Sequence, residues 1–100
     1  MEIHARKLLT IITESALEST LVRDIEQLGA HGYTITDARG KGRQGVRSAG
    51  WEASSNIRLE ILCTEETAMA IAAHCRQHYY DYYAMTLFIV DAGIWRPEKF

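Results

Sequence analysis

The chain has 100 residues, of which 47% are hydrophobic and 24% charged, and its formal net charge is −2 at pH 7. This length predicts one domain, and the apolar content is sufficient for one hydrophobic core without disulfide bridges. The ordinary charge excludes disorder and a strongly basic nucleic-acid-binding chain, and the apolar runs are too short for a membrane-spanning helix.

Residues 1–7 lack the apolar region of a signal peptide, and this favours a cytoplasmic protein. The first predicted strand and helix come next. Residues 7–13 are short and rich in β-branched side chains, which predicts a strand. Ser15 and Glu18 then fit a capping box, which places the start of a helix at Ser15. The apolar stripe of this helix consists of Leu17, Leu21, Ile25 and Leu28, and Gly29 is expected to end it.

The second half of the chain repeats this order. Residues 33–38 have strand character, and residues 56–61 alternate between apolar and polar side chains, which predicts a half-buried strand. Thr64 is expected to cap a second helix, and a last strand spans residues 84–91. The apolar stripe of the second helix consists of Ala68, Ile71, Ala72, Cys75 and Tyr79.

The duplicated strand, Thr-Glu and helix pattern at residues 11–14 and 62–65 predicts two β-α-β units. We therefore expect an α+β fold of the ferredoxin-like split βαβ type, βαββαβ. Two helices cover only one face of a four-stranded sheet, yet the first and last strands are apolar on both faces. A second chain is therefore expected to cover the other face, as in a closed homo-oligomer.

The segment 39–56 interrupts this regular pattern. It holds four of the seven glycines, and four cations against one acid. Glycine amides and arginine side chains suit an anion, so a mobile anion-binding loop, a solvated connection and a nucleic-acid contact remain alternative interpretations. Gly40-x-Gly42-x-x-Gly45 is not a dinucleotide fingerprint, because no helical stripe follows these glycines.

The residues at this point resemble the PII signalling family over nearly the whole chain. The resemblance rests on Gly29-Ala30-His31-Gly32-Tyr33-Thr34-Ile35, on Arg39-Gly40-Lys41-Gly42-Arg43-Gln44 and on Ile57-Arg58-Leu59-Glu60-Ile61. Val46-Arg47-Ser48-x-Gly50 and Tyr83-Ala84 are more specifically similar to the PII-like SbtB group and the carboxysome-associated PII proteins. In this family the segment 39–56 corresponds to the T-loop.

The resemblance implies a PII-like homotrimer that is not an enzyme and binds adenine nucleotides in clefts between subunits. ADP or AMP is expected first, cyclic AMP or ATP are alternatives, and bicarbonate is a further ligand in carboxysome-associated members. The nucleotide-contacting positions implied are Ile12, Gly40, Lys41, Gly42, Arg43, Gln44, Arg47, Ser48, Leu62 and Tyr83. The implied partner is a bicarbonate transporter or a carboxysome-associated protein, to which the protein would signal inorganic-carbon status through T-loop ordering.

The chain departs from the PII family pattern before its last strand, and this departure narrows the set of expected ligands. No glycine-rich loop with a phosphate-binding lysine precedes the last strand, which argues against ATP with Mg²⁺ and 2-oxoglutarate. His74 and His78 lie one helical turn apart, but without an apparent third ligand no metal site is expected. The alternative function is a ferredoxin-like RNA-binding or structural adaptor domain, although the predicted central strands lack the aromatic residues that stack bases.

Overall fold

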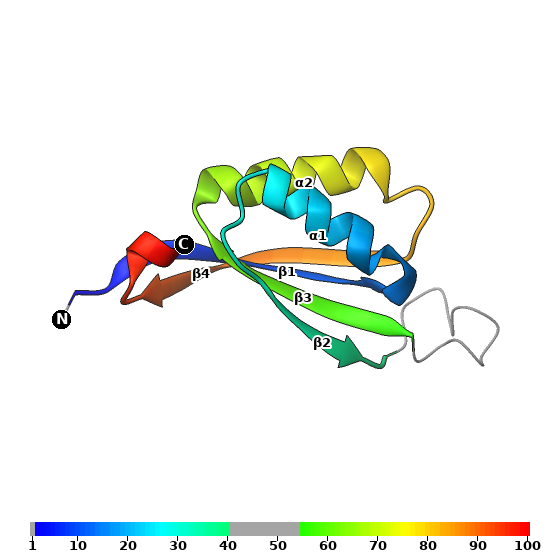
Figure 1. Ribbon diagram of the computed structural model, residues 1–100, viewed down its shortest axis with the longest axis horizontal. Helices are drawn as coiled ribbons and strands as arrows, with labels where there is room; N and C mark the ends of the chain where they lie inside the picture. The colour runs from blue at the N-terminus through cyan, green and yellow to red at the C-terminus, as the bar shows by residue number, and fades with distance from the viewer. Residues whose placement is uncertain (1, 41–54) are drawn as a thin grey trace.

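The computed structural model describes residues 2–40 and 55–100, and these form one antiparallel sheet with two helices (Figure 1). The strands are β1 (His4–Glu14), β2 (Thr34–Ala38), β3 (Asn56–Cys63) and β4 (Met85–Ile94). The helices are α1 (Glu18–Gln27) and α2 (Glu65–His78), and the 3₁₀ turns are Ser15–Leu17 and Pro97–Lys99. None of the helices in these described ranges is both long and apolar enough to cross a membrane.

The strand order β2-β3-β1-β4 confirms the predicted split βαβ topology. Helix α1 connects β1 to β2, and these two strands flank β3. Helix α2 connects β3 to β4, and these two strands flank β1. Because each strand runs antiparallel to its neighbours, the members of each β-α-β unit are parallel to one another and separated by one strand. The fold is therefore α+β and ferredoxin-like, as the sequence predicted.

Both helices pack on the same face of the sheet, and the hydrophobic core lies between them and that face (Figure 1). Leu9 of β1 lies opposite Ile61 of β3 and Ile89 of β4, so one row of apolar side chains crosses the sheet. The predicted helical stripes supply the other side of the core. Buried core residues include Leu17, Leu21, Ile25, Ala68, Ile71, Cys75 and Tyr79.

The two helices begin differently. The Thr64 hydroxyl accepts a hydrogen bond from the backbone amide of Thr67 at 3.2 Å, which confirms Thr64 as the cap of α2. The predicted capping box at Ser15 is wrong. The chain first makes a 3₁₀ turn, and α1 begins at Glu18 without a side-chain cap. The backbone amide of Ser15 is instead bonded to the Ser55 carbonyl at 2.8 Å, so this residue still belongs to the edge of the sheet.

Gly29 ends α1 as predicted, and its backbone conformation explains why glycine is required. Its φ of +114° lies in the region that L side chains rarely adopt. The amide of Ala30 donates to the Ile25 carbonyl at 2.9 Å, and the amide of Gly29 donates to the Glu26 carbonyl at 3.2 Å. This is the Schellman arrangement, which satisfies the last carbonyls of the helix.

The face of the sheet opposite the helices, called the open face below, carries a second set of apolar side chains. Leu87 and Ile89 of β4 pack against the core, so Phe88 and Val90 point to the open face. Phe88 is 40% exposed and Val90 is 46% exposed in the single chain. The prediction that the last strand is apolar on both faces is confirmed.

Candidate functional site

Three parts of the chain meet at the C-terminal end of β1. The Thr13 hydroxyl donates to the Ala84 carbonyl at 2.9 Å, and the Glu14 carboxylate accepts from the Ala84 amide at 2.9 Å. The next residue, Ser15, bonds through its amide to the Ser55 carbonyl. The end of β1 therefore holds the start of β4 on one side and the chain entering β3 on the other.

The described residues on either side of the segment 41–54 lie at the same end of the sheet. Ala38, at the end of β2, pairs with Asn56, and Asn56 pairs with Glu14. Gly40 follows two residues after Ala38 and is exposed, and no atom lies within 4 Å of the position that a Cβ would occupy there. Segment 41–54 is therefore attached at the same end of the sheet as residues 80–84, which we call the 80–84 turn.

The open face next to this edge combines an apolar side chain with an ion pair. Ile12 lies between Arg58 of β3 and Thr86 of β4 and is half-buried. The Arg58 Nε donates to Glu60 Oε2 at 3.1 Å, and the Arg58 guanidinium carbon lies 6.0 Å from the centre of the Phe88 ring. Arg58 and Glu60 belong to one strand, two residues apart. Both ends of this ion pair are partly exposed, so the pair orients Arg58 more than it stabilises the fold.

The 80–84 turn is built around Tyr79. The Tyr79 carbonyl accepts from the amides of Tyr82 and Tyr83, each at 3.0 Å. The rings of Tyr79 and Tyr83 meet edge to face, with their centres 6.0 Å apart. Tyr79 is buried whereas Tyr83 is 37% exposed, so the inner ring supports the outer one at the edge of the candidate site.

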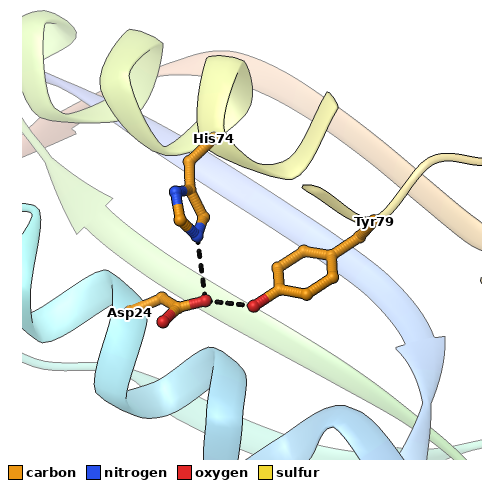
Figure 2. A network of polar contacts seen from close by, with 3 residues as sticks. All are labelled: Asp24, His74 and Tyr79. Carbon is orange, nitrogen blue, oxygen red and sulfur yellow. Dashed lines mark hydrogen bonds and ion pairs between the residues drawn. The ribbon is translucent and has the colours of Figure 1, made fainter. Parts of the chain in front are cut away.

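Tyr79 is itself held by a polar cluster between the helices, called the Asp24 cluster here (Figure 2). One carboxylate oxygen of Asp24, Oδ2, accepts from the Tyr79 hydroxyl and lies 2.9 Å from Nε2 of His74. Burial, followed by the hydrogen bond to Asp24, raises the pKa of the Tyr79 hydroxyl well above its usual value. Burial, with a smaller contribution from the Asp24 charge, raises the pKa of the nearby Cys75 thiol to about 12. The cluster thus contains a carboxylate acceptor and a tyrosine donor that stays protonated.

The family model for nitrogen regulatory protein P-II matches residues 6–99. The chain belongs to the P-II family. The family resemblance inferred from the sequence is therefore confirmed, and the protein is a member of a family of regulatory proteins.

Solved structures of P-II-like proteins share the fold. A crystal structure described as a putative PII-like signalling protein, from Thermus thermophilus, is 43% identical, has a TM-score of 0.85, and covers 100% of this chain and 99% of its own. CPII from Thiomonas intermedia K12, bound to ADP and bicarbonate, is 23% identical with a TM-score of 0.86, and covers 98% of this chain and 96% of its own. A structure of the same protein bound to ADP, AMP and bicarbonate is 21% identical with a TM-score of 0.83, over 95% of this chain and 100% of its own.

The structure of this P-II family member brings some of the predicted site residues together. Ile12, Gly40 and Tyr83 all belong to the end of the sheet at which β1 finishes. Leu62 does not, because it pairs with Leu8, and four residues along β1 separate it from the level of Ile12. This is about 13 Å along a strand. The predicted residues Lys41, Gly42, Arg43, Gln44, Arg47 and Ser48 lie outside the described residues.

Sequence reasoning missed the residues that fix this edge. Glu14 was noted only as part of the duplicated pattern, and the capping of the Ala84 amide by its carboxylate has no local sequence signal. The sequence argues against His74 as a metal ligand but does not indicate its actual contact, in which its Nε2 lies 2.9 Å from Asp24 Oδ2. Within residues 2–40 and 55–100 no group of three or more His, Cys, Asp or Glu side chains is placed to hold a metal ion.

Proposed function

We propose that this P-II family member is a non-enzymatic, homotrimeric sensor that binds ADP or AMP, together with bicarbonate, at the contacts between protomers. The observation that carries the proposal is that Gly40, Ser55 and the 80–84 turn all lie at the end of the sheet where β1 finishes. A ligand at this edge would touch the base of the segment 39–56 directly. That segment is the T-loop of the family and is proposed to signal the bound state.

The proposed subunit contact follows from the open face and from the separation of two site residues. Phe88 and Val90 expose apolar surface, which water disfavours and a second copy of the chain would cover. Ile12 and Leu62 lie too far apart along one sheet to flank the same adenine ring. Two protomers, one contributing Ile12 and the other Leu62, would bring both side chains to one nucleotide.

The proposed phosphate contacts are the glycine amides at Gly40 and Gly42 and the guanidinium group of Arg43. Arginine donates two parallel hydrogen bonds to phosphate or carboxylate oxygens, and the same geometry suits the planar bicarbonate ion. Charged hydrogen bonds contribute about 1.5–3 kcal/mol each. Two or three of them, reduced by the entropy lost in ordering a segment, correspond to dissociation constants on the order of micromolar.

The mechanism proposed is a shift in the population of T-loop conformations. A ligand that is held by only one of these conformations stabilises it by its differential affinity, and a partner that recognises that conformation then binds more tightly. We propose a bicarbonate transporter or a carboxysome-linked protein as this partner, and inorganic-carbon status as the signal. The similarity in fold to CPII, which is bound to ADP and bicarbonate in one of its structures, supports the choice of these ligands, whereas the partner is proposed from the family resemblance of the sequence.

Calorimetric titration with ADP, AMP, ATP and cyclic AMP, each with and without bicarbonate, tests the proposal. Arg43→Ala should weaken every phosphate-bearing ligand at least several-fold while leaving the oligomer intact. Arg76→Ala is the matched control, because it removes an exposed arginine from the last turn of α2. Equal affinities for Arg43→Ala and the unmodified protein would exclude the role given to Arg43.

The same preparations separate the alternative functions. A structural adaptor would give no heat with any nucleotide. An RNA-binding domain would retard single-stranded RNA in a salt-dependent manner, because phosphate contacts release counterions. The central strands carry no aromatic side chain on the open face, where Leu8, Thr10 and Ile12 of β1 face away from the helices, so a base-stacking platform is not supported.

A further inference from the structure

We propose that the Asp24 cluster positions the 80–84 turn at the ligand site, so that Asp24 and Tyr79 set the affinity for nucleotide without touching it. This inference rests on the proposed function, because it assumes that the ligand lies at the end of β1. It assigns a positioning role to Asp24 and Tyr79, which lie on the helix side of the sheet.

The cluster joins three elements through one oxygen atom. Asp24 belongs to α1 and His74 to α2, and Tyr79 is the residue directly after α2 (Figure 2). Oδ2 of Asp24 accepts from the Tyr79 hydroxyl and lies 2.9 Å from His74 Nε2. The Asp24 side chain is 16% exposed and that of His74 is 25% exposed, so water competes little for these bonds. Hydrogen bonds to a charged, partly buried carboxylate are among the stronger ones in proteins.

Tyr79 connects the Asp24 cluster to the 80–84 turn. Its carbonyl accepts the amides of Tyr82 and Tyr83, and its ring supports the Tyr83 ring edge to face. A rotation or displacement of Tyr79 would therefore move both the backbone and the exposed ring of Tyr83. The Tyr79 hydroxyl donates to Asp24, which lies 55 residues away in sequence, and this hydrogen bond connects Tyr79 and the turn that follows it to α1.

The other end of the turn is fixed independently. Thr13 and Glu14 hold both backbone polar groups of Ala84 against β1. The turn is thus held on the sheet through Ala84 and on the helices through Tyr79. The amides of Tyr79 and Tyr80 are also bonded to the Cys75 carbonyl of α2, at 2.9 and 3.2 Å. Loss of the Asp24 contact would leave these bonds and the sheet attachment intact and free only the Tyr79 side chain from α1, so the expected effect is on the position of the turn and not on the topology.

The experiment compares Tyr79→Phe, Asp24→Asn and the double variant with the unmodified protein. Tyr79→Phe removes the hydroxyl while keeping the ring that contacts Tyr83, and Asp24→Asn removes the charge while keeping an acceptor oxygen. Tyr33→Phe is the matched control, because it makes the same chemical change at a side chain that is 42% exposed and lies outside both the 80–84 turn and the Asp24 cluster. The dissociation constant for ADP is measured by calorimetry at a temperature at which circular dichroism shows each protein folded.

We expect each single variant to weaken ADP binding roughly 3- to 10-fold, the range of couplings carried by residues outside a site. The double variant should bind ADP no more weakly than the worse single variant, because Tyr79→Phe removes, and Asp24→Asn weakens, one and the same contact. Hydrogen exchange at the Tyr82 and Tyr83 amides should accelerate in the same variants. Tyr33→Phe should bind ADP as the unmodified protein does.

Unchanged ADP affinity in Tyr79→Phe and Asp24→Asn would overturn the inference while leaving the proposed function standing, even if their melting temperatures fall. A cluster that only stabilises the fold would give that result. Equal weakening by Tyr33→Phe would overturn it too, because the effect would then not depend on the cluster. If the unmodified protein binds none of the nucleotides, the proposed function fails and the inference fails with it. Should one single variant not fold, the other decides.

Discussion

Replacement of Phe88 by alanine tests whether the open face is the contact between protomers. Phe88 is 40% exposed in the single chain. A phenylalanine side chain presents about 200 Å², so about 80 Å² would be buried on assembly, or about 2 kcal/mol per protomer at about 25 cal/mol per Å². The contribution is made three times in a trimer, about 6 kcal/mol in all, which corresponds to about a 10⁴-fold lower association constant for three chains.

The concentration at which half of the chains are assembled scales with the inverse square root of that constant. Phe88→Ala should therefore raise this midpoint about 100-fold, without unfolding the protomer, because the helix-facing residues Leu87 and Ile89 remain. Sedimentation velocity over a dilution series, with light scattering at the highest concentration, measures the midpoint directly. Met69→Ala is the control, since Met69 is 55% exposed but lies on α2 on the helix side of the sheet.

Two results would refute the reasoning. One is an unmodified protein that sediments as a monomer at every concentration, since the open face would then be exposed to water in the native protein. The other is an identical midpoint for Phe88→Ala and the unmodified trimer, which would place the contact elsewhere. A shift of the midpoint by Met69→Ala as large as that by Phe88→Ala would place it on the helix layer.

Two further predictions concern the protomer itself. Gly29→Ala should lower the free energy of unfolding by about 1–2 kcal/mol in urea titrations, because φ is +114° and a Cβ would lie 3.2 Å from the Thr67 hydroxyl oxygen. Gly32→Ala is the control, because no atom lies within 4 Å of the position that a Cβ would occupy there. An equal effect of both changes would contradict the explanation. Cys75, with its pKa raised to about 12, should be thiolate in only about 1 in 10⁴ molecules at pH 8, and it becomes more ionised as the pH rises toward that value. Cys75 and the buried Cys63, whose pKa is also raised by burial, should react with a chromogenic disulfide only after denaturant is added, and rapid reaction of the native protein would contradict this.

The fold was predictable because its signals are local and agree with one another. Alternation at residues 56–61 predicted the strand that extends to Cys63, and the stripe from Leu17 to Leu28 predicted the helix face that packs on the core. The error at Ser15 has a long-range cause. A serine followed three residues later by a glutamate satisfies the local rule for a capping box, but the Ser15 amide is bonded to the Ser55 carbonyl and the chain makes a 3₁₀ turn first.

The candidate site was less predictable, because its fixed points are contacts between residues that lie far apart in sequence. Thr13 and Ala84 are 71 residues apart, and His74 and Asp24 are 50 residues apart. The family resemblance implied Ile12, Gly40 and Tyr83 as ligand contacts, and the fold places these three residues at one end of the sheet, which leaves their contact with a ligand as a prediction. It did not identify the side chains that hold this end together, because these side chains are bonded to the protein itself.

The arrangement at the end of β1 also suggests which parts of the site can vary in sequence. Ala84 is held through its backbone amide and carbonyl, and every residue except proline provides both groups, so the side chain at this position is not fixed by the two contacts. Thr13, Glu14 and Asp24 act through their side chains, so a substitution there removes a contact of the edge or of the Asp24 cluster. Under the proposed function, ligand binding can therefore be altered at two levels. Residues of the segment 39–56 would change which ligand is bound, and residues at the end of β1 and in the Asp24 cluster would change how the 80–84 turn is positioned toward the same ligand.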